Sequence, residues 1–249
     1  VNITGNNLIM YTSQYHGYAP TNGHVGFVNK GEISTSATSS ENILWYSMSD
    51  GNSGPNRAMY FDNRGKIKLE GTKNTFAIIN SENSSGRGWF SVQNNNKIDL
   101  AGDKITGITF GKDYDISEIL LNRPITITRT NSTGVYFNKD VNLEGGKAVA
   151  TSTSNNVVTT LPGTTRESIL NVDITAGTGN SGLFFDAYDE NNTAANIKVL
   201  DVPNATINLS SNDGSNAGIY AKAGTVNLKP NAKVNLTAGK DNVGIYVDN

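Results

Sequence analysis

The chain has 249 residues, of which 36% are hydrophobic, 26 are glycine and none is cysteine, and its formal net charge is −2. It has no basic cluster of the kind that binds nucleic acid and no apolar run near the ~18 residues that span a membrane. We therefore expect no nucleic-acid partner and no membrane insertion by this segment, and the lack of cysteine is typical of an exported bacterial protein or of a cytosolic one.

A short strand motif recurs along the whole chain, in which Ile or Val is followed two residues later by Leu, Ile or Thr. Each copy alternates apolar and polar residues, which is the period of a strand with one buried face. A repeat this small cannot enclose a core alone and must stack on its neighbours, so successive copies 27 to 47 residues apart predict a solenoid. The copies begin at Val1, Ile33, Ile67, Ile98, Ile125, Val172, Ile207 and Val234.

A second series places glycine or another small residue before an apolar or aromatic pair. A third pattern joins the two, because the segment 27–33 (Phe-x-Asn-x-Gly-x-Ile) returns at 61–67. Together they predict about eight coils of three short strands, hence an all-β, three-sided parallel β-helix that occupies residues 1–249 as one segment with loop insertions. The second series comprises Gly26, Ala58, Gly88, Gly107, Gly134, Gly182, Gly218 and Gly244.

Three stretches interrupt this rhythm. The range 11–24 is polar and aromatic and is predicted to be a loop, and 47–57 is a cluster of turn residues. The range 144–168 is rich in Ser and Thr and is predicted to protrude, with a hairpin through 156–159. The range 116–121 fits either a strand or a turn of helix.

The C-terminal range 215–249 shows the repeat most clearly. Gly218-Ile219-Tyr220 returns as Gly244-Ile245-Tyr246, and Val226-Asn227-Leu228 and Val234-Asn235-Leu236 lie between them. Alternation places Asn227 and Asn235 outward. Asn208 and Asn235 occupy equivalent outward positions in neighbouring coils, which predicts that their side-chain amides stack. The residues predicted to point inward, nearly fully buried, are Ile219, Val226, Leu228, Val234, Leu236 and Ile245.

The pattern GIY-x-K-x-G-x-VNL followed by N-x-GIY resembles the repeats of passenger domains in type V autotransporter adhesins, most closely the large fusobacterial outer-membrane adhesins. The resemblance covers about residues 90–249. It implies a right-handed parallel β-helix, exported and displayed on the bacterial outer membrane, that serves cell adhesion, coaggregation and virulence. The implied partners are a host-cell receptor or a protein or glycan on another bacterium, and no functional residue transfers from these repeats.

Catalytic and metal sites find little support in the sequence. The range 51–55 (GNSGP) resembles a serine-protease nucleophile loop, but that chemistry needs a histidine oriented by a carboxylate, and His16 and His24 share one loop upstream. Acidic residues are scattered, and cysteine ligands are missing. We expect no catalytic residue, no metal and no cofactor, so the chain is predicted not to be an enzyme. The alternatives are a polysaccharide-degrading β-helix enzyme and a purely structural stalk.

Aromatic residues provide the candidate binding sites. If Ile219 points inward, alternation turns Tyr220 outward, and equivalent rings in neighbouring coils would then form an external ladder ~4.8 Å apart. Such a ladder either stabilises one face or contacts a glycan or protein. The candidate ligand-binding residues are Tyr136, Phe184, Tyr220 and Tyr246 in the ladder, and Tyr11, Tyr15 and Tyr18 in the loop.

Overall fold

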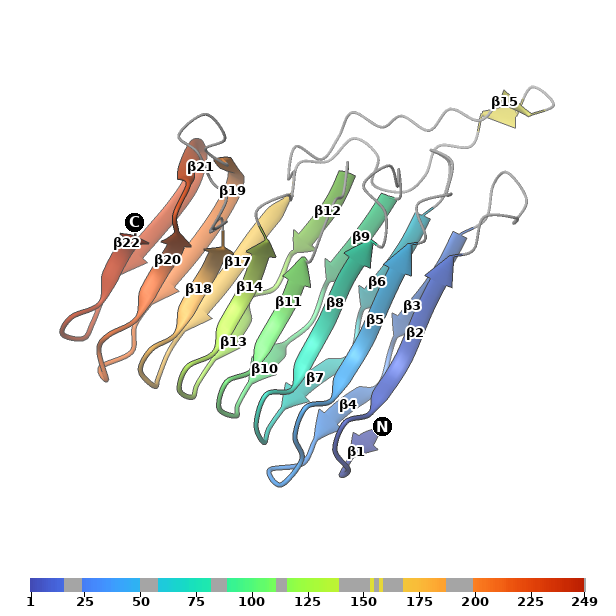
Figure 1. The fold of residues 1–249 in the computed structure, drawn as a ribbon, viewed down its shortest axis with the longest axis horizontal. Coiled ribbons are helices and arrows are strands. Elements are labelled where there is room, and N and C mark those ends of the chain that lie inside the picture. The colour runs from blue at the N-terminus through green and yellow to red at the C-terminus, as the bar shows by residue number, and fades with distance from the viewer. Residues whose placement is uncertain are drawn as a thin grey trace.

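The chain folds as a parallel β-helix. The computed structural model describes residues 1–15, 24–49, 58–81, 89–110, 116–138, 153–154, 157–158, 168–186 and 199–248, and every element within them is a β-strand. Figure 1 shows the strands lying side by side in successive coils from the N-terminus to the C-terminus, which confirms the all-β solenoid. Within these residues, no helix is long and apolar enough to cross a lipid bilayer.

One face of the helix is an eight-stranded parallel sheet with one strand from each coil, in the order of the chain. Eight coils therefore stack, as the repeat count predicts. The strands are β2 (Ile9–Tyr15), β5 (Ile43–Ser49), β8 (Thr75–Ser81), β11 (Thr106–Phe110), β14 (Thr133–Asn138), β18 (Ser181–Asp186), β20 (Ala217–Lys222) and β22 (Val243–Asp248).

The other two faces belong to one larger sheet of twelve strands. In the first coils each face has its own short strand. From β17 onward, one strand per coil follows both faces, and the register of β19 and β21 shifts between Val202 and Asn204, where the chain bends. One face contains β1 (Asn2–Ile3), β4 (Glu32–Thr35), β7 (Lys66–Leu69), β10 (Ile98–Leu100) and β13 (Ile125–Ile127), the other contains β3 (His24–Asn29), β6 (Ala58–Asn63), β9 (Trp89–Asn94) and β12 (Ile116–Leu121), and β17 (Ile169–Ile174), β19 (Val199–Leu209) and β21 (Thr225–Leu236) continue both.

The recurring Ile/Val motif forms one inward column of the stack. Ile98 is in register with Ile67 on one side and with Ile125 on the other, and the pairing continues through every later copy of the motif. Between Ile33 and Ile207 the members are no more than 1% exposed. The period read from the sequence is therefore the coil period of the helix, confirmed residue by residue.

The last coil differs from the expectation of nearly complete burial. Ile219 is fully buried, as predicted, whereas Val226 and Val234 are in register with buried residues but are only partly buried. Leu228, Leu236 and Ile245 are also in register with buried residues one coil earlier, but they are 39%, 47% and 42% exposed. The expected burial is wrong for all five of these residues, Val226 and Val234 included, because one side of each contacts the preceding coil while no described coil covers the other.

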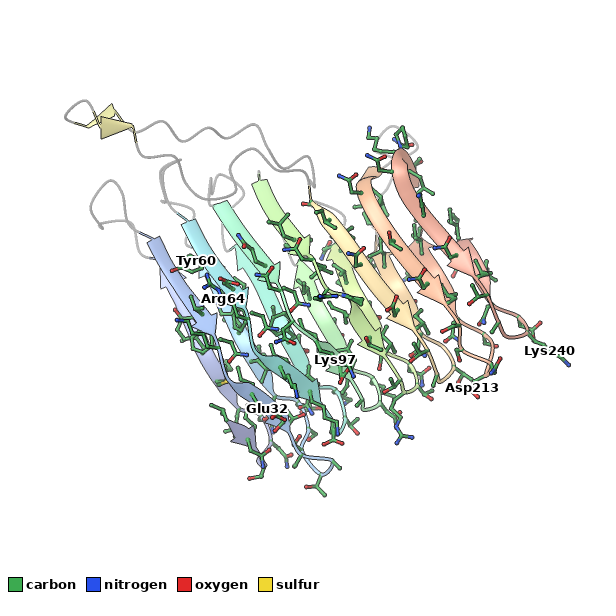
Figure 2. The ribbon with its side chains drawn as sticks, turned by 180° about the vertical axis from the view of Figure 1, so that it is seen from behind. Glu32, Tyr60, Arg64, Lys97, Asp213 and Lys240 are labelled. Atoms are coloured by element: carbon green, nitrogen blue, oxygen red, sulfur yellow. The ribbon has the colours of Figure 1, made fainter. Side chains whose placement is uncertain are left out.

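The glycine series divides between two faces. Gly107, Gly134, Gly182, Gly218 and Gly244 belong to strands of the eight-stranded face, whereas Gly26 and Ala58 belong to β3 and β6 on another face. Gly26 is needed for a separate reason, since a Cβ there would meet the ring of Tyr60, the residue labelled in Figure 2. The single series of the sequence is thus two structural columns, and Gly88 lies outside the described residues.

The predicted loop over 11–24 is wrong at both ends. β2 continues through Tyr15, and β3 begins at His24. Residues 116–121 form a strand, β12, which settles the choice between strand and helix. Within 144–168, β15 (Thr153–Ser154) pairs antiparallel with β16 (Val157–Val158), in agreement with the predicted hairpin, and most of that range lies outside the described residues. The turn cluster predicted at 47–57 is wrong at its start, because β5 continues through Ser49, and 50–57 lies outside the described residues.

A repeated turn precedes each strand of the eight-stranded face. Two residues before every strand the backbone has a positive φ of 54° to 68°, and the next position often carries a buried asparagine. The Asn180 backbone N–H donates to Asn216 Oδ1 at 3.0 Å, and the Asn216 N–H donates to Asn242 Oδ1 at 3.1 Å. Each side chain thereby satisfies a buried amide of the preceding coil, which holds successive turns in register. The positive-φ residues are Asn7, Glu41, Lys73, Lys104, Asn131, Gly179, Ser215 and Asp241.

Candidate ligand-binding groove

The predicted aromatic ladder is present on the outer surface of the eight-stranded face. Tyr136, Phe184, Tyr220 and Tyr246 are in register on β14, β18, β20 and β22. Their ring centroids are separated by 5.3, 4.8 and 5.3 Å, and their planes are inclined by 18° to 26°. The separations follow the coil spacing, so the backbone itself sets the stacking.

The stacking determines which part of each ring a ligand can reach. The faces of Phe184 and Tyr220 are directed at neighbouring rings, so their carbon–hydrogen edges remain open to solvent. Tyr246 is the last ring and is 45% exposed. Contacts with most of the ladder would therefore be made at ring edges, where the aromatic quadrupole is positive and favours oxygen atoms.

Two tyrosine hydroxyls of the ladder are bound to carboxylates in the next coil. Tyr136 donates to Asp186 Oδ2 at 2.9 Å, and Tyr220 donates to Asp248 Oδ2 at 3.1 Å. Each aspartate lies two positions beyond the facing ring in the register, so both bonds have the same geometry. These contacts fix the rings and direct their hydroxyls toward the C-terminal ends of the strands.

Both tyrosines hold their protons more strongly than a free phenol. Burial raises the pKa of Tyr136 well above its usual 10.0, and the hydrogen bond to Asp186 and that carboxylate's charge raise it further. Burial, followed by the bond to Asp248, also raises the pKa of Tyr220. Tyr136 and Tyr220 therefore keep their protons at physiological pH and can donate these hydrogen bonds.

A groove of about 380 Å³ runs beside the ladder across the last three coils. One wall is formed by the rings of Phe184, Tyr220 and Tyr246, and the other by the turns that precede β18, β20 and β22. This volume is within the range of small-ligand sites. The residues lining the groove are Gly179, Asn180, Ser181, Phe184, Ser215, Asn216, Ala217, Tyr220, Asp241, Val243 and Tyr246.

The groove exists because small side chains form its floor. Ser181, Ala217 and Val243 occupy one outward column, and in the preceding coil the same position is Thr133. The glycines that follow these floor residues in the strands, Gly182 and Gly218 among them, have no room for a side chain. The groove therefore has the aromatic rings on one side and the turns on the other, with the small side chains between them.

The second candidate site is placed differently from the ladder. Tyr11 is in register with the buried Trp45 and therefore points inward, where its ring lies 5.0 Å from that of Phe27. Burial raises its pKa. Tyr15 ends β2, but its side chain and all of Tyr18 lie outside the described residues. The structure thus brings together the four ladder rings and separates Tyr11 from them.

Sequence reasoning missed the second wall of the groove. Asn180, Asn216 and the positive-φ residues Gly179, Ser215 and Asp241 line it, although they read as ordinary turn residues. An available signal was the asparagine that comes directly before the strand in several coils. Among the described residues, no group of three or more His, Cys, Asp or Glu side chains is arranged to hold a metal ion.

Comparison of the chain with protein-family models, with curated proteins and with solved structures finds no match. The chain's own sequence and geometry are therefore what bears on its function. These provide an elongated stack of coils with a stacked aromatic ladder and a groove along one face.

Proposed function

We propose that this chain is a segment of an exported bacterial surface adhesin, of the autotransporter passenger type, that attaches the cell to host cells or to other bacteria. The β-helix supplies a rigid support, and the groove beside the aromatic ladder supplies the contact surface. The repeat pattern in the sequence favours the same assignment. The observation that carries the proposal is the groove itself, in which aromatic edges face polar turns across small floor residues.

The chemistry of the two walls suits recognition of a protein or a glycan. Rings held by stacking and by bonds such as Tyr220 to Asp248 lose little freedom on binding, so the site is preorganised. Ser181, Ser215 and Asp241 offer hydroxyl and carboxylate groups on the floor and the opposite wall. A ligand with an apolar side and a polar side would satisfy both walls.

A structural stalk is the competing assignment, and the ladder itself favours it. Stacked rings and Tyr–Asp hydrogen bonds hold neighbouring strands together without any ligand. A stalk role predicts that every ladder ring matters only for stability. A binding role predicts that rings lining the groove also matter for attachment, whereas Tyr136, which does not line it, does not.

Attachment of the purified chain to host cells and to other bacteria tests the proposal. We expect Tyr220→Ala/Tyr246→Ala to attach less than the wild type, and Tyr136→Ala to attach normally, with folding verified for each by circular dichroism. Tyr15→Ala/Tyr18→Ala tests the loop as the alternative contact. Equal attachment by all folded variants would support the stalk, and release of reducing sugar ends from a polysaccharide would support the enzyme alternative.

A further inference from the structure

We infer that the groove beside the ladder binds a linear, uncharged glycan that lies along the axis of the β-helix, an inference that rests on the proposed function and names its ligand class. The groove crosses the coils of β18, β20 and β22 and therefore runs perpendicular to the strands. Its long direction is the direction in which coils repeat.

The coil spacing fits a polymer of hexoses. Neighbouring coils are separated by ~4.8 Å, and the sugar-to-sugar repeat of an extended β-1,4-linked glycan is close to this distance. Each sugar would then meet one ring edge and one turn, and alternate sugars, which face opposite ways in such a chain, would present opposite edges to them. A groove that spans three coils would accommodate two to three sugars.

The two walls match the two sides of such a chain. The hydroxyls of Tyr136 and Tyr220 are held by Asp186 and Asp248 at the C-terminal side of the ladder, whereas the groove lies at its N-terminal side. The groove therefore meets carbon–hydrogen edges of the rings, which suit apolar sugar surfaces and ring oxygens. The opposite wall offers Ser215 and Asp241 to sugar hydroxyls.

The charge of the lining favours a neutral ligand. Asp241 is the charged residue among those that line the groove. Figure 2 shows Asp213 and Lys240 at the outer edges of two successive turns, and neither belongs to the lining. A uronic acid or sulfated chain would bring negative charge beside the Asp241 carboxylate, which costs affinity at low ionic strength.

Ala217 provides a variant that blocks the groove without altering the ladder. It lies on the floor between Ser181 and Val243, and its side chain points outward. Ala217→Leu would fill the space that the glycan needs. Thr133→Leu is the matched control, because Thr133 occupies the same outward column one coil before Ser181 and does not line the groove.

Calorimetric or NMR titration with cello- and chito-oligosaccharides of one to four sugars tests the inference, with a β-1,4-linked glucuronic acid trimer as the charged comparison. We expect affinity to rise up to the trimer and then level off, and the charged trimer to bind more weakly. Ala217→Leu should weaken trimer binding by about tenfold or more, while Thr133→Leu leaves it unchanged. Absence of neutral-glycan binding, or equal binding by both variants, would overturn the inference.

Cell attachment measured on the same two variants separates this inference from the proposed function. If Ala217→Leu loses attachment although no glycan binds the wild type, the groove is adhesive but takes a protein segment, and the glycan inference is wrong. If glycans bind in the groove and Ala217→Leu still attaches normally, the ligand class is correct and the adhesive role of the groove is wrong.

Discussion

At the scale of single residues, hydrogen bonds that cross from one coil to the next fix side chains on both sides of the groove. The buried Asn216 illustrates this, since it accepts the Asn180 backbone N–H and donates to the carbonyls of Gly177 and Gly214 at 3.0 and 2.9 Å. On the ladder, Tyr220, which lines the groove, donates to Asp248 in the next coil at 3.1 Å. Groove geometry thus depends on polar side chains as well as on the apolar core.

The Tyr136–Asp186 bond gives the fold a defined sensitivity to alkaline pH. The pKa of Tyr136 in the folded chain lies above its usual 10.0. The neutral hydroxyl therefore contributes stability that is fully present below pH 10 and is lost as pH rises through the folded value. Ionisation removes the donated proton and places a second negative charge beside Asp186.

Tyr136→Phe should therefore lower the free energy of unfolding at neutral pH by about 0.5–1.5 kcal/mol, the usual contribution of one hydrogen bond. The variant should also lose less stability than the wild type as the pH rises above about 10, the ordinary tyrosine pKa from which the contribution of the hydroxyl begins to be lost. Urea unfolding at a series of pH values measures both effects. An identical alkaline loss in the two proteins would show that the hydroxyl is not the titrating group.

At the scale of elements, the glycine column explains how closely the eight-stranded face approaches the strands behind it. A Cβ at Gly182 would lie 2.6 Å from the carbonyl oxygen of Gly218 and 2.7 Å from Cγ2 of Ile207. Gly134 and Gly218 have equivalent neighbours in the coils that follow them. These contacts are with backbone atoms and buried side chains, which cannot move aside without disturbing the packed core.

Gly182→Ala is expected to destabilise the chain by about 1–3 kcal/mol, the usual cost of overpacking a core. Ser181→Ala is the neighbouring control, because that side chain points outward into the groove and should change stability little. Thermal unfolding of the two variants provides the comparison. Similar melting temperatures for Gly182→Ala and the wild type would contradict the close packing of coils.

The strands that the sequence predicts best are those whose signal is unique to one face. The copies of the Ile/Val motif align in the structure because aliphatic residues at alternate positions of these strands pack inward in successive coils. The glycine–aromatic signal was ambiguous, since Gly26 and Gly107 begin similar segments on different faces. Loop boundaries were missed at Tyr15 and His24 because both are polar enough to resemble turns.

The ladder could be predicted from alternation alone, but the groove could not. Outward rings follow from the inward position of Ile219. The groove depends on small residues such as Ser181 and Ala217 being in register in three coils, next to turns with positive φ. That coincidence involves two columns from different parts of each coil, and a linear pattern does not reveal their distance.

At the scale of the whole molecule, the stack is a quasi-one-dimensional array in which each coil contacts only its neighbours. Among the described residues, the large exposed hydrophobic side chains concentrate at its two ends, as with Ile9 at 52% in β2 and Val247 at 45% in β22. Residues of the middle coils such as Ile125 are fully buried. Stability is therefore expected to vary along the axis.

Hydrogen exchange should be slowest in the strands near the middle of the stack, such as β13, β14 and β17. It should be fastest in β1 and β2 at one end and in β21 and β22 at the other, because the coils there pack against a neighbour on one side only. Mass spectrometry of peptic fragments measures this gradient. Uniform protection from end to end would indicate one globular cooperative unit instead.

The most direct test of the central claim is a crystal structure of the chain with a neutral β-1,4-linked trisaccharide. We predict that the trisaccharide occupies the groove along the helix axis, between the rings of Phe184, Tyr220 and Tyr246 and the turns that contain Ser215 and Asp241. An empty groove with the sugar bound on another face of the β-helix would contradict the account.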